Sequence, residues 1–352
     1  MAERVAGNVD EGTLLAEEAR AEELLSDYAG TRLSGLARLV RKNRAFFAAS
    51  GFFVVLMLSF ITANPGVFLE LGVYIAVLVT LPLVMIPAVA SVFVIATGEI
   101  DLSFPSTVGL SALVFAKSVA SGLDPTLSLF LGLLVGCGVG LMNAFLVVYL
   151  GLSSLVATLG ALFLIRGIIQ VVSDGLPIDV TSLSASTFGH IFVGQIGSFP
   201  VQMFWAIGFA SLALVLFNHH RFGAHICFVG DNGKAAREMG INVGWVKTRA
   251  FMFVGLGAAL VGVLSVLVNR TFFPTMGEGL LLTVLASVFV GGTPTWGGVG
   301  SISGAVVGGL TVSFIESGII GAWGLSGFYT QLFYGLVIIL ALAGHRLEAP
   351  RR

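Results

Sequence analysis

The sequence predicts an all-α protein that crosses a membrane many times. Hydrophobic residues make up 56% of the 352 residues, charged residues make up 11%, and the mean hydropathy is +0.99. A soluble globular domain carries about 25% charged residues, so most of this surface must face lipid. The 46 glycines support this prediction, because small residues let helices pack closely in a bilayer.

About ten segments are apolar and long enough to be membrane helices, since a spanning helix needs about 20 mainly apolar residues. The eighth segment is short and runs into the Gly-rich stretch 291–304. That stretch favours a broken or tightly packed helix over a phosphate-binding loop. In chain order the segments are 46–63, 71–97, 104–121, 126–150, 154–172, 199–217, 248–268, 280–292, 300–320 and 328–344.

A polar tail of residues 1–45 precedes the transmembrane domain, which we place at 46–345. Within the tail, apolar residues recur at helical spacing between glutamates over residues 10–28, which predicts a short amphipathic helix. The tail is either a solvated topology anchor or a docking surface for a partner subunit.

The basic residues predict the orientation. Of 18 Lys and Arg residues, seven precede the first segment, five lie between His219 and Arg249, and three follow the last segment. An even number of spans places all three clusters on one side, which the positive-inside rule assigns to the cytoplasm. We therefore expect both termini, and the long loop at 218–247, to be cytoplasmic.

No motif indicates catalysis or metal binding. HExxH, Walker A and GxSxG are lacking, and His219 and His220 are more typical of an interfacial polar pair than of metal ligands. A net charge of −1 gives no reason to expect a nucleic-acid partner. We predict a transport subunit with no catalytic residue, metal or cofactor of its own, whose nucleotide would be hydrolysed by another subunit.

The loop at 218–247 is the first candidate site. Its residues 234–240 (KAAREMG) predict a short helix with glycines as breakers at both ends. Two alanines offer a low-profile face and three charged side chains flank it. A helix of this kind suits a groove on a soluble partner, although a plain connector helix is the alternative. The residues concerned are Gly230, Lys234, Ala235, Ala236, Arg237, Glu238 and Gly240.

Acidic residues inside apolar sequence are the second candidate, because an acid at a helix centre costs about 2.5–3.5 kcal/mol on insertion scales. Asp101 either caps the helix that follows or lines a pathway. Glu99 has no such local role, which favours a pathway or inter-helix function. Glu316 is expected to form a helix–helix hydrogen bond.

Four blocks, at 96–112, 152–168, 229–264 and 281–310, together resemble the permease subunit of ABC importers for ribose, xylose, arabinose, galactosides and related small sugars. The resemblance implies a type II fold like that of the cobalamin importers, in a bacterial cytoplasmic membrane. It also implies a second permease copy or related permease, ATPase subunits that bind ATP and Mg, and a periplasmic or lipid-anchored sugar-binding protein. The loop at 229–242 matches the coupling segment of that family, which contacts the ATPase.

Glu99 departs from the family, in which the pattern TGGIDLS has glycine at this position. Here the carboxylate would pair with Arg166 or with a hydroxyl of the substrate. Delivery by a binding protein predicts a weakly polar pathway that works by alternating access. Its candidate residues are Thr97, Glu99, Asp101, Asn143 and Thr158. A stand-alone secondary carrier or channel is the alternative, and it would need paired intramembrane charges but no nucleotide.

Overall fold

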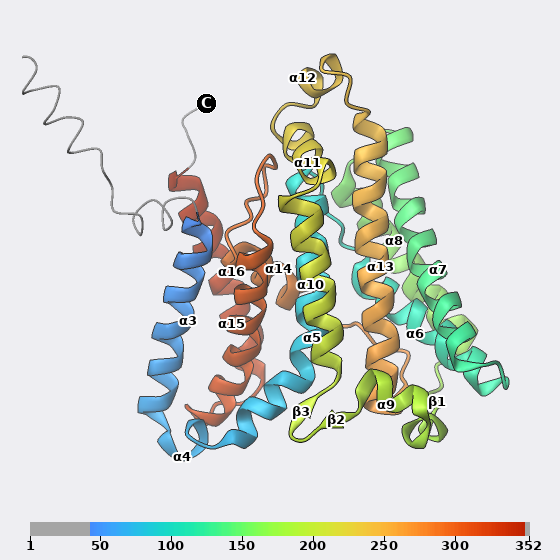
Figure 1. Ribbon diagram of the computed structural model, residues 1–352, viewed down its shortest axis with the longest axis vertical. Helices are drawn as coiled ribbons and strands as arrows, with labels where there is room; N and C mark the ends of the chain where they lie inside the picture. Colours follow the sequence, from blue (N-terminus) through green and yellow to red (C-terminus); the bar gives the residue numbers. More distant parts are fainter. Residues whose placement is uncertain (1–42, 349–352) are drawn as a thin grey trace, which may run out of the picture.

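The computed structural model describes residues 43–348 as a bundle of long helices (Figure 1). Seven helices in this range are apolar and long enough to cross a membrane, or eight spans if the bent pair α10 and α11 counts as one. Two shorter apolar helices, α6 and α14, complete a set that matches the ten predicted segments one to one. The helices are α3 (Arg44–Ala63), α4 (Pro65–Phe68), α5 (Leu71–Ala96), α6 (Phe104–Ala120), α7 (Pro125–Ala144) with a π-helical turn (Phe145–Tyr149), α8 (Ser154–Ser173), α9 (Thr187–Val193), α10 (Gln202–Asn218), α11 (Arg221–Asp231), α12 (Gly233–Glu238), α13 (Val243–Asn269), α14 (Leu280–Val290), α15 (Ile302–Gly321) and α16 (Phe328–Glu348).

The prediction of an all-α polytopic membrane protein is confirmed. The four strands within residues 43–348 are two residues long and form two small pairs at the end of the bundle opposite α12 (Figure 1). β1 (Ile178–Asp179) pairs with β4 (Thr271–Phe272), and β2 (Gln195–Ile196) pairs with β3 (Phe199–Pro200), both antiparallel. The tail helix predicted over residues 10–28 lies outside the described residues.

α5 and α13 form the centre of the bundle. In the apolar part of each of these two helices 78% of the residues are buried, whereas in α3 and α16 only 11% are buried. α5 also contains Pro82 and Pro87. Interior prolines remove helical hydrogen bonds and bend the helix, and the lower part of α5 runs obliquely before it turns along the bundle axis (Figure 1).

Glycines allow α7 and α13 to pack in close contact. A Cβ at Gly136 would collide with the backbone carbonyl of Gly255, and a Cβ at Gly255 would collide with that of Gly136. This close approach is the packing expected where lipid offers no hydrophobic drive for helix association.

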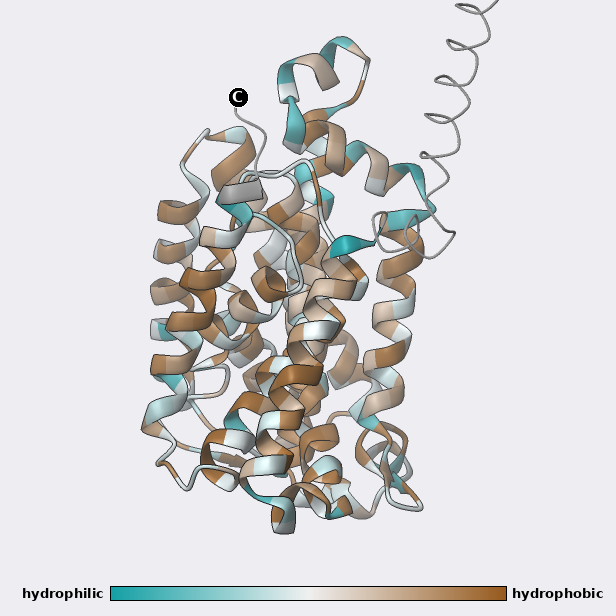
Figure 2. Cartoon of the chain, turned by 90° about the vertical axis from the view of Figure 1, so that its left-hand side faces the viewer, coloured by the Kyte–Doolittle hydropathy of each residue, from teal (hydrophilic) through white to brown (hydrophobic). Residues whose placement is uncertain are grey.

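Hydrophobic residues cover the helix bodies, and hydrophilic residues gather at the end that carries α11 and α12 (Figure 2). The start of α3 and the end of α16 lie towards this same end (Figure 1). The described segments that adjoin the three basic clusters therefore lie at one end of the bundle, while most of the first and last clusters falls outside the described residues.

The structure corrects the expected break at Gly230. Residues 221–231 form α11, which continues the chain after α10 at an angle of 65°. Gly230 is inside this helix, and the break occurs two residues later, at Asn232, the N-cap of α12. The expected loop at 218–247 is thus mostly helical.

Candidate functional site

α12 projects from the hydrophilic end of the bundle, as the sequence predicts for residues 234–240 (Figure 1). The side-chain oxygen of Asn232 accepts hydrogen bonds from the backbone N–H groups of Lys234 and Ala235, both at 3.1 Å, and so caps the helix. At the other end Gly240 adopts a φ of +80°, a conformation that glycine adopts readily. Local sequence therefore fixes both ends of this short helix.

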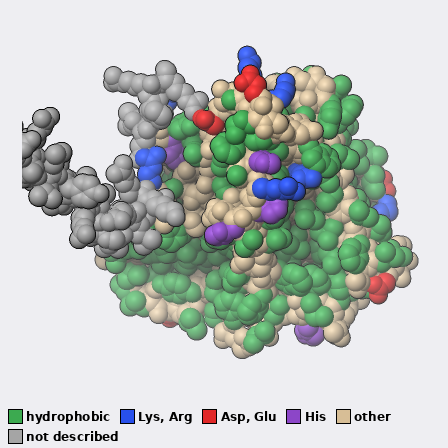
Figure 3. Space-filling view, turned by 45° about the horizontal axis from the view of Figure 1, so that its top comes forward, with side chains coloured by type: hydrophobic (Ala, Val, Ile, Leu, Met, Phe, Trp, Pro, Cys, Tyr) green, Lys and Arg blue, Asp and Glu red, His purple; other side chains and the backbone are tan. Residues whose placement is uncertain are grey.

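Charged side chains cover the outer surface of α12. Lys234, Ala235, Arg237 and Glu238 are exposed, and charges of both signs gather on the projecting tip (Figure 3). Ala236 is only 1% exposed, so the expected low-profile face consists of Ala235 and not of Ala236.

A non-helical stretch between α5 and α6, loop 97–103, carries the second set of predicted residues. It contains Thr97, Glu99 and Asp101, and the structure brings Asn143 of α7 and Thr158 of α8 against it. All five predicted pathway residues therefore lie in or against one loop, although they come from three separate parts of the sequence.

Asp101, Ser103 and Asn143 form what we call the polar cluster. The Asp101 carboxylate accepts hydrogen bonds from the backbone N–H (2.8 Å) and the hydroxyl (2.7 Å) of Ser103. The Asn143 amide nitrogen donates to the Ser103 hydroxyl at 2.7 Å and to both carboxylate oxygens at 3.4 Å. All three side chains are buried, and the Asn143 side-chain oxygen has no hydrogen-bond partner among the described residues.

The N-cap position of α6 is held by Ser103 and not by Asp101. The capping role considered for Asp101 is therefore indirect, since its carboxylate holds the N–H of the residue that precedes the helix. A buried carboxylate is tolerated only when it is hydrogen-bonded, and the polar cluster meets that requirement.

Hydroxyl groups of α8 hold the middle of loop 97–103. The backbone N–H of Leu102 donates to the Thr158 hydroxyl at 3.0 Å, and that of Ile100 donates to the Ser154 hydroxyl at 3.2 Å. Thr97 differs, because its hydroxyl donates to the Val94 carbonyl of its own helix at 2.7 Å. Thr158 thus supports the loop, and the hydroxyl donors of both Thr97 and Thr158 are engaged by carbonyl groups.

Glu99 forms an ion pair with Lys247 in the second turn of α13. The expected pairing with Arg166 is wrong. Arg166 instead donates to the carbonyls of Pro274 (2.9 Å) and Met276 (3.1 Å), and its side chain lies 3.6 Å from the carboxylate of Glu278. Glu316, also considered from the sequence, is exposed on α15.

Three backbone segments cross where loop 97–103 begins, and we call this crossing the glycine junction. The N–H of Gly298 donates to the Ala96 carbonyl at 2.9 Å, and Gly230 of α11 lies so close to both groups that a Cβ would collide with them. Gly297 has a φ of +81° and also lies close to Gly98, since a Cβ on Gly297 would lie 2.8 Å from the Gly98 nitrogen. The Gly-rich stretch 291–304 therefore serves close backbone packing, as the sequence favoured.

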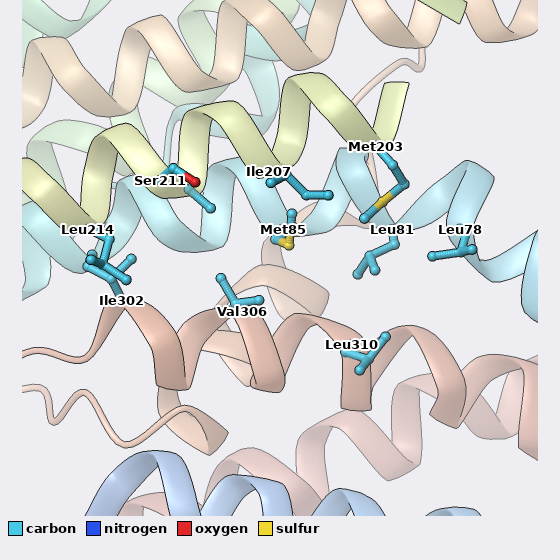
Figure 4. Close-up of a pocket in the computed structure, with 11 residues that line it drawn as sticks. Leu78, Leu81, Met85, Met203, Ile207, Ser211, Leu214, Ile302, Val306 and Leu310 are labelled. Atoms are coloured by element: carbon cyan, nitrogen blue, oxygen red, sulfur yellow. The ribbon is translucent and has the colours of Figure 1, made fainter. Parts of the chain in front are cut away.

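An apolar groove of about 330 Å³ opens between α5, α10 and α15 (Figure 4). Ser211 is the single polar side chain among its lining residues. Hydroxyl groups buried there would lose their hydrogen bonds to water without replacement, so this groove does not suit a sugar.

No group of three or more His, Cys, Asp or Glu residues able to hold a metal occurs within residues 43–348. His219 and His220 lie between α10 and α11, where the His220 ring nitrogen accepts the backbone N–H of Phe222 at 3.1 Å. His220 thus caps the start of α11.

Sequence reasoning missed Lys247, Ser103 and Ser154 as members of the site. Lys247 was counted only as one of the basic residues that set the orientation, since its partner Glu99 lies 148 residues away. Ser103 could have been found from its position after Asp101, because an aspartate side chain commonly accepts the backbone N–H of the residue two positions on.

Residues 73–342 match the family described as the branched-chain amino acid transport system permease component. The ribose import permease protein RbsC of Escherichia coli K12 is 32% identical over 259 residues, which are 73% of this chain and 80% of that protein. The D-allose transport system permease protein AlsC of the same strain is 32% identical over 256 residues, 72% of this chain and 77% of that protein. The autoinducer 2 import system permease protein LsrC of Yersinia enterocolitica is 31% identical over 258 residues, 72% of this chain and 69% of that protein. No solved structure matches the chain.

Proposed function

The chain belongs to the family of transport-system permease components of ABC importers, and from this premise we propose that it translocates a monosaccharide or a related small polyol delivered by a binding protein. It is a transport subunit and not an enzyme. In this proposal ATP and Mg bind to separate ATPase subunits, and a second permease, either a copy of this chain or a relative, completes the pathway. The membrane is the bacterial cytoplasmic membrane, with α12 and both termini on the cytoplasmic side.

The projecting helix α12 is the observation that carries the proposal. Its exposed side chains Lys234, Ala235, Arg237 and Glu238 combine charges of both signs with one small residue. A capped helix of six residues is small enough to enter a groove on a soluble protein. Docking of α12 in the ATPase would let nucleotide-driven closure of the ATPase pair act on the membrane helices.

The chemistry around loop 97–103 favours an uncharged hydroxylated solute. Both acids there have partners within the chain, since Glu99 pairs with Lys247 and Asp101 with the other members of the polar cluster. An amino acid would need charged groups for its ammonium and carboxylate ends, because an unpaired charge is costly away from water. A sugar needs only hydroxyl and amide partners, and relatives named for ribose and D-allose import carry such substrates.

Alternating access is the proposed mechanism. A ligand shifts a conformational equilibrium only by its difference in affinity between the states, so the permease has no need to bind the sugar tightly. The binding protein supplies selectivity, and ATP binding and hydrolysis supply the drive.

Co-purification of the chain with its ATPase subunits tests the coupling role of α12. Glu238→Arg reverses one charge on the exposed surface of α12 and should strongly reduce recovery of the ATPase, while membrane insertion stays normal. Gly240→Trp should do the same, although it also strains a backbone with positive φ.

Glu70→Arg is the matched control, because it makes the same charge reversal at the exposed start of α5, at the opposite end of the bundle (Figure 1). Recovery of the ATPase should be unchanged by Glu70→Arg. Equal recovery with all three variants would overturn the assignment of α12 to ATPase docking.

A further inference from the structure

Two contacts attach the segment around α12 to the same short stretch, residues 96–99. Before α12, Gly230 lies against the carbonyl of Ala96 in the glycine junction. After α12, Lys247 pairs with Glu99. α12 is therefore held between one backbone contact and one ionic contact, and both reach the start of loop 97–103.

The polar cluster follows directly after these contacts. Glu99 is two residues before Asp101, whose buried carboxylate binds Ser103 and Asn143. Protein interiors are closely packed and transmit displacements instead of absorbing them. A displacement of the backbone at Glu99 would therefore reach Asp101, whose carboxylate is the centre of the polar cluster.

The ion pair is more shielded from solvent than an ordinary surface pair. The side chains of Lys247 and Glu99 are 21% and 18% exposed. Charges that are partly removed from solvent are screened less than exposed ones, and loss of one partner leaves the other charge poorly compensated. The pair also spans two elements far apart in sequence, so it contributes to tertiary and not to local structure.

We infer that Glu99 and Lys247 are positioning residues of the transport cycle, whose ion pair ties α13 to loop 97–103 so that displacement of α12 reaches the polar cluster. The inference rests on the proposed function in one respect, namely that an ATPase displaces α12. The Gly230 contact restrains the other end of the same segment. Movement of α12 is then passed to loop 97–103 by the charges of Glu99 and Lys247. These charges can be removed without changing the packing of the glycine junction.

The first arm of the test needs no ATPase. Amide hydrogen exchange of the peptide covering loop 97–103 is measured in the purified permease. The variants are Glu99→Gln, Lys247→Gln and a swapped double variant, Glu99→Lys with Lys247→Glu. Each single variant should exchange about tenfold faster, as loss of a partly buried pair predicts. The swapped double variant should return the hydrogen-exchange rate of the loop close to its native value. Arg249→Gln is the control, because Arg249 is an exposed cation two residues further along α13 that contacts Trp245.

The second arm measures sugar molecules transported per ATP hydrolysed, with the ATPase and binding protein reconstituted. Both single variants should keep their ATPase subunits and continue to hydrolyse ATP, but transport per ATP should fall about tenfold. The swapped double variant should restore most of the native ratio of sugar transported to ATP hydrolysed, and Glu99→Asp should restore part of it. A role in stability alone would lower the amount of protein recovered without changing the ratio.

Unchanged exchange in the single variants, or a double variant as impaired as the single ones, would overturn the inference. Faster exchange with a normal transport ratio would also overturn it, since the pair would then order the loop without coupling it. Failure of the proposed function is seen separately, because the native chain itself would then show no ATP-driven transport. The exchange arm would still decide whether the ion pair holds the loop.

Discussion

Substitution of Gly230 by alanine should weaken the glycine junction. The added Cβ would collide with the Ala96 carbonyl and the Gly298 nitrogen, so the two segments must separate. Their hydrogen bond of 2.9 Å would be strained or lost, which costs about 1–3 kcal/mol when the groups are buried. Overpacking adds about 1–3 kcal/mol. Gly230→Ala should therefore lower the free energy of unfolding by about 2–6 kcal/mol.

The assay is reversible unfolding of the purified chain in mixed micelles, followed by tryptophan fluorescence, together with transport after reconstitution. Gly208→Ala in α10 is the control, because a Cβ there meets no atom within 4 Å. A helical Gly-to-Ala change without a clash should be neutral or stabilise by about 0.5–1 kcal/mol. Equal unfolding free energies for Gly230→Ala and Gly208→Ala would refute the close crossing of the three backbones.

Three further substitutions test other contacts. Asn143→Ala removes amide donors from the buried carboxylate of the polar cluster and should lower the unfolding free energy by about 1–3 kcal/mol. An unchanged unfolding free energy in the same assay would contradict the hydrogen bonding described. Arg166→Gln removes charged N–H donors from two carbonyls in the segment 273–279 and should speed hydrogen exchange there, whereas native exchange rates would show that these bonds hold nothing in place. Gly136→Ala should destabilise the α7–α13 contact by about 1–3 kcal/mol, while Gly138→Ala, which faces open space, should not, and equal effects would argue against close packing of these helices.

The helices could be predicted from sequence because bilayer thickness fixes the length of apolar sequence needed to cross it. All ten predicted segments correspond to helices, including the short eighth segment, which ends at Val290 before the Gly-rich stretch. The ends of α12 were close to those predicted, because Asn232 and Gly240 determine them by local hydrogen bonding and backbone conformation.

Contacts between distant residues could not be predicted in the same way. The sequence marks Glu99 as unusual but favours Arg166 or a substrate hydroxyl as its partner and not Lys247, since nothing in the sequence reports which helices are neighbours. Gly230 was interpreted as a helix breaker, whereas the fold uses its lack of a side chain for a backbone crossing. The burial of Ala236 depends on the direction in which a helix of six residues faces, and that direction is set by tertiary packing.

ATP-dependent uptake by the reconstituted complex tests the central claim most directly. Proteoliposomes containing the permease and its ATPase subunits, with the binding protein outside, would be supplied with the radiolabelled sugar that the binding protein carries. We predict accumulation that requires ATP and Mg inside the vesicle and the binding protein outside. Uptake by the permease alone, driven by an ion gradient and independent of nucleotide, would contradict the claim and identify a secondary carrier.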